Sequence, residues 1–73
     1  MTLLDAKVGE TYTVKSVNTE DEELNSFLFS LGCYEGEPIT AISKRSRGMT
    51  LSIKDGRYSV DSALAGVIEI EEK

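Results

Sequence analysis

Residues 24–39 constrain the fold more than any other part of this 73-residue chain. They read as the end of an amphipathic helix, a glycine that stops the helix, a tight connection with a second glycine, and the beginning of a strand. The two glycines are Gly32 and Gly36, and Pro38 stands at the first position of the strand, where its missing backbone donor does least harm. No reacting group lies in this segment, so it indicates an architecture rather than a reaction.

The helix that leads into this segment has a start signal and one apolar stripe. Thr19 is the predicted N-cap, and Glu22 three residues later completes a capping box. The acidic residues 20–23 face the positive end of the helix dipole. Apolar side chains then recur at the spacing of one helix face, at Leu24, Phe27, Leu28 and Leu31. The pattern predicts a helix that packs one face on the rest of the domain.

The end of the helix predicts the environments of three side chains. Gly32 stands where a left-handed residue closes a helix, and Cys33 would then complete a Schellman motif through an apolar contact with Leu28. Cys33 is therefore predicted to be a packing residue rather than a reactive thiol. Phe29 falls outside the stripe and Tyr34 lies in the following turn, so both are predicted to be at least partly exposed. Such aromatics form either a partner surface or a cover over the rim of the domain.

Alternation of apolar and polar residues predicts five short strands. They are expected over residues 10–17, 38–43, 49–54, 58–60 and 67–71. A lead-in turn over residues 3–8, whose leucines cover one end of the core, precedes the first strand. The alternation breaks at Ser16 and Val17, where we expect a bulge or the strand end. Residues 71–73 are predicted to be a frayed polar end.

Turn signals join these strands. A basic loop is predicted over residues 44–48, and the Asp-Gly pair at residues 55–56 predicts a type I′ hairpin turn. Before the last strand, a single helical turn is predicted to run through Ala65, with Asp61 or Ser62 as its cap.

The order of these elements predicts a mainly β fold. We expect a single domain over residues 1–73: a small SH3-like, five-stranded β-barrel with one amphipathic helix between strands 1 and 2 and a short helical turn before the last strand. Closure, complete or nearly so, would let so short a chain avoid an open sheet edge. An OB-type barrel is the alternative architecture. Either barrel leaves only its outer surface for function.

The catalytic inventory of the chain is short. It has no histidine, the usual proton carrier near neutral pH and the commonest metal ligand. The acidic residues 20–23 occupy successive helix positions and point in different directions, so they do not converge on an ion. The glycines match neither a phosphate loop nor a dinucleotide fingerprint. We therefore expect a protein that is not an enzyme, with no catalytic residue, no cofactor and no metal site.

The charge of the chain is negative overall and unevenly distributed. A net charge of −5 argues against general nucleic-acid binding. Five of the eight basic residues nevertheless fall within fourteen positions, at Lys44, Arg45, Arg47, Lys54 and Arg57. This cluster and the acidic residues 20–23 are either solvated faces or a dipole that orients docking. Because the single cysteine cannot form an internal disulfide and no signal segment or membrane span is evident, we expect a cytoplasmic location without membrane insertion.

The joint spacing of glycines and aliphatic residues resembles the FeoA family of bacterial ferrous iron transport accessory proteins. The Leu-Gly-x-x-x-Gly-x-x-Ile core of that family is matched by Leu31, Gly32, Gly36 and Ile39. Gly48 and Gly56 follow in the same order, and residues 65–70 resemble the closing Ala-x-x-Ile-x-Val segment. The resemblance covers essentially the whole chain and implies an SH3-like fold.

Several positions depart from the family pattern. Ser26 and Phe27 stand where an arginine is usual, Glu35 where proline is frequent, residues 48–50 where the family has a Gly-Asp-Pro-like loop, and Val60-Asp61 where it has a Leu-Arg pair. These positions are exposed or turn-forming, so they bear on the partner surface rather than on the fold.

The resemblance implies a small cytoplasmic protein that acts beside FeoB, the membrane GTPase that carries ferrous iron. The leading hypothesis is an adaptor that docks on the cytoplasmic part of this transporter, with Phe29, Tyr34, Arg45 and Arg47 as partner-binding residues. The same fold serves as a regulatory module in iron-dependent repressors, so a weak transition-metal-binding regulatory domain is the alternative. A nucleic-acid module that uses the basic cluster with Tyr58, and a structural dimer through an uncovered strand edge, are further alternatives.

Overall fold

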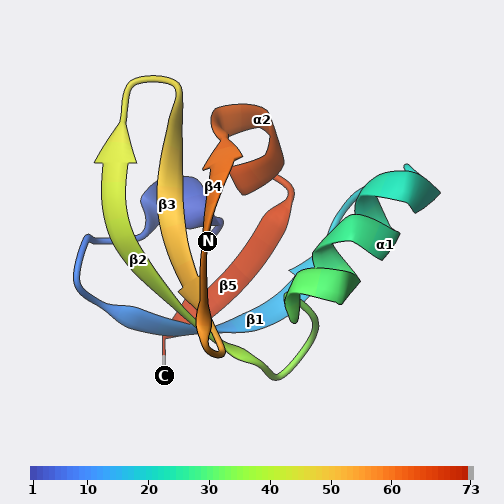
Figure 1. The fold of residues 1–73 in the computed structure, drawn as a ribbon, viewed down its shortest axis with the longest axis horizontal. Helices are drawn as coiled ribbons and strands as arrows, with labels where there is room; N and C mark the ends of the chain where they lie inside the picture. The colour runs from blue at the N-terminus through green and yellow to red at the C-terminus, as the bar shows by residue number, and fades with distance from the viewer. Residues whose placement is uncertain (73) are drawn as a thin grey trace.

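The computed structural model describes residues 1–72 and confirms the mainly β architecture. The strands are β1 (Thr11–Val17), β2 (Pro38–Arg45), β3 (Gly48–Ile53), β4 (Gly56–Asp61) and β5 (Ile68–Glu72). The helical elements are η1 (Leu3–Asp5), α1 (Glu22–Leu31) and α2 (Ser62–Ala65). Figure 1 shows a strongly curved sheet, with α2 at its upper end and α1 projecting to one side. The predicted positions of both helices, between strands 1 and 2 and before the last strand, are confirmed.

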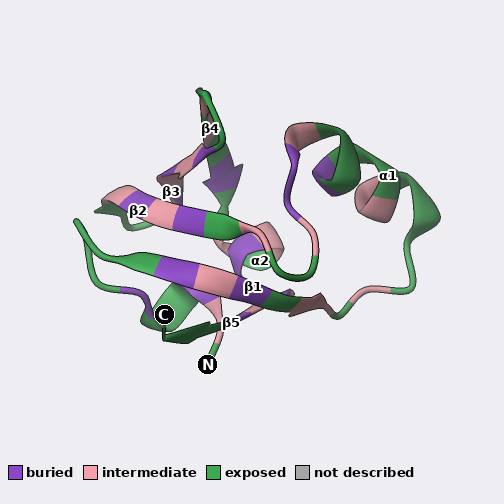
Figure 2. Cartoon of the chain, turned by 90° about the horizontal axis from the view of Figure 1, so that it is seen from below, coloured by how far each residue is buried: buried purple, intermediate pink, exposed green. Residues whose placement is uncertain are grey.

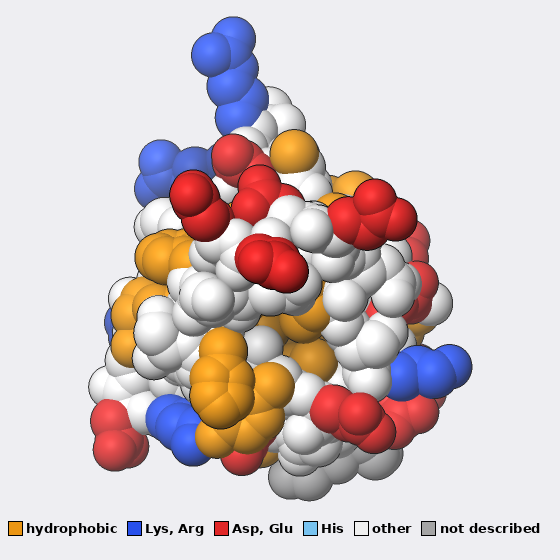
Figure 3. Space-filling view, turned by 90° about the vertical axis from the view of Figure 1, so that its right-hand side faces the viewer, with side chains coloured by type: hydrophobic (Ala, Val, Ile, Leu, Met, Phe, Trp, Pro, Cys, Tyr) orange, Lys and Arg blue, Asp and Glu red, His pale blue; other side chains and the backbone are white. Residues whose placement is uncertain are grey.

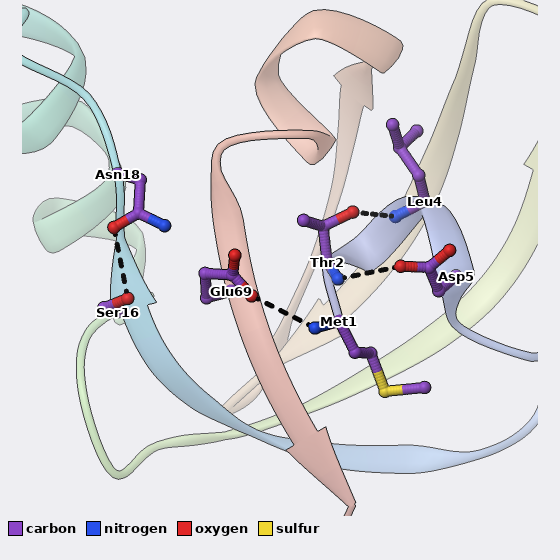
Figure 4. A network of polar contacts seen from close by, with 7 residues as sticks. All are labelled: Met1, Thr2, Leu4, Asp5, Ser16, Asn18 and Glu69. Carbon is purple, nitrogen blue, oxygen red and sulfur yellow. Dashed lines mark hydrogen bonds and ion pairs between the residues drawn. The ribbon is translucent and has the colours of Figure 1, made fainter.

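The sheet is curved but open. All neighbouring strands are antiparallel, in the order β4-β3-β2-β1-β5. Within residues 1–72, no ladder joins β4 to β5, so the predicted barrel is not fully closed, although the strand number and the SH3-like class are right. The outer edge of β5 is instead covered by the N-terminal segment, because Ile70 N–H donates to the carbonyl of Met1 at 2.8 Å and Thr2 forms an isolated β-bridge with Glu69. Figure 4 shows this segment, with the N-terminal amine of Met1 paired with the Glu69 carboxylate.

The inner face of the curved sheet holds one apolar core. Its buried members are Leu3, Ala6, Tyr12, Val14, Leu28, Cys33, Ile39, Ala41, Met49, Leu51, Ile53, Val60, Ala65, Ile68 and Ile70. Figure 2 shows the resulting alternation of buried and less buried residues along β1 and β2. Of the two leucines expected to cover one end of the core, Leu3 is fully buried and Leu4 is 50% exposed. Only one leucine can face inward because the two are adjacent in a short 3-10 helix.

Helix α1 begins with a different cap from the predicted one. Asp21 is the N-cap, and its Oδ1 accepts hydrogen bonds from the N–H groups of Glu23 at 3.0 Å and Leu24 at 3.2 Å. Thr19 Oγ1 accepts from the N–H of Asp21, two residues later and still outside the helix. The capping box predicted for Thr19 and Glu22 is therefore wrong. Glu22 is the first helical residue, and the side chain of Asp21 accepts hydrogen bonds from the free amides of the first turn.

Removal of the observed cap has a measurable expected cost. Asp21→Ala should lower the free energy of unfolding by about 1 kcal/mol, because two first-turn amides lose their acceptor. Thr19→Ala should cost less, since the threonine side chain bonds an amide outside the helix. Urea denaturation followed by far-UV circular dichroism compares the two variants. A larger loss for Thr19→Ala would mean that the helix is capped as the sequence predicted.

The apolar face of α1 is narrower than its spacing predicts. Leu28 is buried, and Leu24 and Leu31 are only half-buried. Phe27, predicted to belong to the buried stripe, is 49% exposed. The reason is the position of α1, which projects to one side of the sheet (Figure 1) and so leaves much of its surface uncovered. Leu28 is therefore the single fully buried attachment of the helix.

The end of α1 confirms the predicted Schellman motif. Gly32 has φ 94° and ψ 11°, in the left-handed region that favours glycine. Cys33 N–H donates to the carbonyl of Leu28 at 2.9 Å, and Gly32 N–H donates to that of Phe29 at 3.0 Å. Cys33 is buried in the core, as predicted.

The turns differ from the predictions in detail. Strand β2 extends to Arg45 and β3 begins at Gly48, so the basic loop expected over residues 44–48 shrinks to a two-residue turn. The next hairpin turns at Lys54 and Asp55, because Ile53 already pairs with residue 56. Lys54, at φ 54°, takes the left-handed conformation that the Asp-Gly pair was expected to supply. The type I′ prediction at residues 55–56 is therefore displaced by one position.

The remaining local predictions are mostly confirmed. The register shift between Val14 and Ser16 is the expected bulge. Asp61 caps α2, with Leu64 N–H donating to its carboxylate at 2.7 Å. The frayed end predicted over residues 71–73 is wrong for its first two residues, which pair with β1 in the sheet. Lys73 lies outside the described residues.

Candidate functional site

The most exposed aromatic surface lies at the end of α1. The rings of Phe29 and Tyr34 have centroids 4.8 Å apart and planes inclined by 32°, a tilted aromatic contact. Phe29 is 60% exposed and Tyr34 is half-buried, so the prediction of exposure is confirmed for both. We refer to these two residues as the aromatic pair. Phe27, two residues before Phe29, lies on a different side of the helix.

Lys54, in the β3–β4 hairpin, contacts Tyr34 of the aromatic pair. Its Nζ donates a hydrogen bond to Tyr34 Oη at 2.9 Å, lies 5.2 Å from the centroid of that ring, and is 3.8 Å from Glu37 Oε1. The hydrogen bond to Tyr34, and then the charge of Glu37, raise the pKa of Lys54 above its ordinary value. Sequence reasoning placed Lys54 in the basic cluster and missed this contact, because the two side chains are 20 positions apart.

Two hollows flank the aromatic pair. One, of about 580 Å³, lies between α1 and the end of β1 and is lined by Ser16, Val17, Asn25, Ser26, Phe29, Ser30, Cys33, Tyr34 and Glu35. The other, of about 490 Å³, lies between the end of α1 and the β3–β4 hairpin and shares Phe29, Ser30 and Tyr34 with the first. Figure 3 shows this side of the molecule, with apolar side chains gathered in its lower half and acidic side chains above them and to the lower right. The aromatic pair thus separates two neighbouring hollows, the larger lined by Glu35 and the smaller by Lys54 and Asp55.

The structure separates the arginines from the aromatic pair. Arg45 and Arg47 line a third hollow, of about 400 Å³, at the turn between β2 and β3. The aromatic pair contacts the hairpin at the other end of β3, and the five steps from Gly48 to Ile53 span about 17 Å. The four residues predicted to bind one partner therefore form two separate candidate contacts.

The predicted basic cluster is divided in the same way. All five of its side chains are exposed. Lys44, Arg45 and Arg47 lie near the β2–β3 turn, and Lys54 and Arg57 lie at or after the β3–β4 turn. The Nζ of Lys44 donates to the carbonyl of Leu4 at 2.8 Å. The five basic residues are close in sequence but do not form one cluster in space, because strand β3 separates the two groups and places them at opposite ends of the hairpins.

Cys33 behaves as a core residue. Only 1% of its surface is exposed, and burial raises the pKa of its thiol to about 11. The thiol is therefore protonated near neutral pH and is a poor nucleophile or metal ligand in this state.

The residues that the structure describes contain no group of three or more His, Cys, Asp or Glu side chains placed to hold a metal ion. None of the helices within residues 1–72 combines the length and the hydrophobicity that a membrane crossing requires.

The fold and surface define a small SH3-like domain whose candidate site is an exposed face. The FeoA domain model matches residues 1–72, and the chain belongs to the FeoA family. None of the curated proteins compared with the chain matches it.

Solved structures share the fold at low sequence identity. An iron uptake regulatory protein (FeoA) has a TM-score of 0.85 and 19% identity, over 97% of this chain and 95% of that one. FeoA of Stenotrophomonas maltophilia, solved with zinc and described as a prokaryotic SH3 domain protein, has a TM-score of 0.85 and 18% identity, over 97% and 89%. A manganese-dependent transcriptional repressor has a TM-score of 0.90 and 17% identity, over 100% of this chain and 41% of the repressor. These likenesses confirm the SH3-like class over the OB-type alternative, and the chain spans less than half of the repressor.

Proposed function

We propose that this chain is a cytoplasmic accessory protein of bacterial ferrous iron uptake that docks on the cytoplasmic part of a FeoB-type membrane GTPase. Membership of the FeoA family supports the link to iron transport. The observation that carries the docking proposal is the aromatic pair, in which Phe29 keeps 60% of its surface exposed. An exposed aromatic side chain contributes little to folding, whereas aromatic side chains are enriched among the residues that dominate binding energy.

The aromatic pair is prepared for docking before the partner arrives. The Schellman motif fixes the chain direction after α1, and Lys54 fixes Tyr34 by a hydrogen bond of 2.9 Å. A ring that is already ordered loses less conformational entropy when it is buried in an interface. The pair therefore offers a rigid apolar anchor, and the two hollows beside it can receive side chains of the partner.

The surrounding charge favours a neutral or basic partner surface. The chain carries a net charge of −5, and Glu35 lines the larger hollow. Arg45 and Arg47 lie at the other end of β3, so they would contact a different part of the transporter. In this arrangement the aromatic pair supplies most of the affinity, and the arginines adjust the orientation of docking.

Titration of the chain with the soluble GTPase domain of the transporter tests the proposal. Phe29→Ala is expected to weaken binding at least about tenfold, because it removes a side chain at the centre of the proposed contact. Phe27→Ala is the matched control: it removes an equally large ring, 49% exposed, from another side of the same helix. The control should leave the affinity within about twofold of the unmodified chain.

Each outcome of the titration decides a separate point. Absence of binding by the unmodified chain would reject the docking function itself. Binding that Phe29→Ala leaves unchanged would reject the aromatic pair as its site. A loss confined to the double variant Arg45→Glu and Arg47→Glu would move the docking surface to the β2–β3 turn. Only a selective loss in Phe29→Ala supports the proposal as stated.

A further inference from the structure

The two outer strands of the sheet differ in how their free edges are covered. The N-terminal segment lies along β5: the carbonyl of Met1 accepts a hydrogen bond from Ile70 N–H, and Thr2 forms an isolated β-bridge with Glu69. Strand β4, six residues long, has β3 as its neighbour on one side only. Within residues 1–72, no backbone hydrogen bond outside the β3 ladder involves Arg57 or Ser59. An open edge strand of this length is a template for a further strand.

The register of the β3–β4 hairpin identifies which peptide groups of β4 face the open edge. Ile53 pairs with Gly56 across a two-residue turn, so Gly56 and every second residue after it direct their peptide groups at β3. The same alternation continues past the end of the strand, because Ser62 N–H donates to the carbonyl of Arg47 at 3.0 Å. Arg57 and Ser59 therefore direct their N–H and C=O groups away from β3.

We propose that two copies of this chain pair antiparallel through their β4 edges, about a two-fold axis at Ser59. In this register Ser59 faces its own copy, and its outward peptide groups meet those of the second chain. Arg57 faces Asp61 of the second copy on the exposed side of the strand, so opposite charges meet twice. On the other side, Tyr58 faces Val60, an aromatic and a β-branched residue. The sequence of β4 is therefore complementary to itself.

Other two-fold registers of the same edges are less favourable. Centring the pair on Arg57 would oppose two arginines, and centring it on Asp61 would oppose two aspartates. Centring it on Tyr58 or Val60 would place a serine opposite the charged residue. The register centred on Ser59 is the one that opposes arginine to aspartate. The matching charges favour a second copy of this chain over an arbitrary extended segment. One β4 strand carries both Arg57 and Asp61, so two copies supply both members of each ion pair.

Sedimentation equilibrium over a concentration series tests the pairing with the complete chain. The unmodified chain should show a concentration-dependent doubling of mass. Arg57→Asp places like charges in both pairs and should raise the dimer dissociation constant about tenfold or more. Lys15→Asp makes the same charge change on an exposed side chain of the inner strand β1 and should leave the constant unchanged.

Two further variants separate pairing from folding. Asp61→Arg also removes the carboxylate that caps α2, so the informative result is not its loss of pairing alone but recovery of the dimer in an equimolar mixture with Arg57→Asp, where each aspartate faces an arginine. Ser59→Pro removes an N–H that β3 does not use and should abolish pairing while the far-UV spectrum is retained. A monomeric unmodified chain, or a dimer indifferent to these variants, would overturn the proposal. Protection of β4 amides from exchange only when the GTPase domain is added would assign the edge to that partner instead.

Discussion

Replacing Leu28 with alanine is expected to detach α1 from the sheet. Leu28 is the one fully buried side chain of the helix, at 1% exposure, and its carbonyl also accepts the hydrogen bond that closes the Schellman motif. Loss of a buried leucine costs about 2–5 kcal/mol. For a domain of this size the whole free energy of unfolding is about 4–11 kcal/mol. One truncation would therefore remove a large part of the stability of the domain.

The functional consequence follows from the position of the aromatic pair. Phe29 belongs to α1 and Tyr34 follows it, so a detached helix no longer holds the two rings 4.8 Å apart. Urea denaturation gives the stability loss, and titration with the GTPase domain gives the accompanying loss of binding. Phe27→Ala is the control, because its ring is 49% exposed and its removal should change stability by less than about 1 kcal/mol. Equal losses for the two variants would mean that α1 is attached through its whole apolar stripe.

Local sequence signals predicted α1 better at its end than at its start. The end depends on one glycine in a left-handed conformation, and few other residues can supply that conformation. The start is ambiguous, because Thr19 and Asp21 are both good N-caps and each does accept a backbone hydrogen bond. Choosing between them requires the direction in which the chain leaves β1, which only the packed structure fixes.

Exposure of the candidate site residues was predicted correctly where the residues are close in sequence. Phe29 and Tyr34 are five positions apart: helix geometry predicted the exposure of Phe29, and the turn after the helix predicted that of Tyr34. The contact with Lys54 and the separation from Arg45 both depend on how β2, β3 and β4 fold back on one another. The open β4 edge was equally hidden, since strand alternation gives the faces of a sheet and not whether its outer strands meet.

Replacing Gly48 with alanine is expected to weaken the β3–β4 ladder by about 3 kcal/mol. The sequence predicted Gly48 to lie in a loop, but it begins β3 opposite Asp61. A Cβ at this position would collide with the carbonyl oxygen of Val60 and would lie 3.2 Å from the Cα of Asp61. Both contacts are with backbone, which cannot rotate away as a side chain can. The strands must therefore separate at the end where Asp61 also caps α2.

Gly66→Ala is the matched control for this substitution. Gly66 has an ordinary helical conformation, with φ −70°, and the nearest atom to an added Cβ is the Leu4 side-chain carbon Cδ1 at 3.3 Å, which can move. Its cost should stay below about 1 kcal/mol. Urea denaturation of both variants makes the comparison, and hydrogen exchange of the β4 amides locates the damage. If Gly48→Ala costs no more than Gly66→Ala, β4 can shift away from β3 freely, and the β4 edge is then too mobile to pair with a second copy.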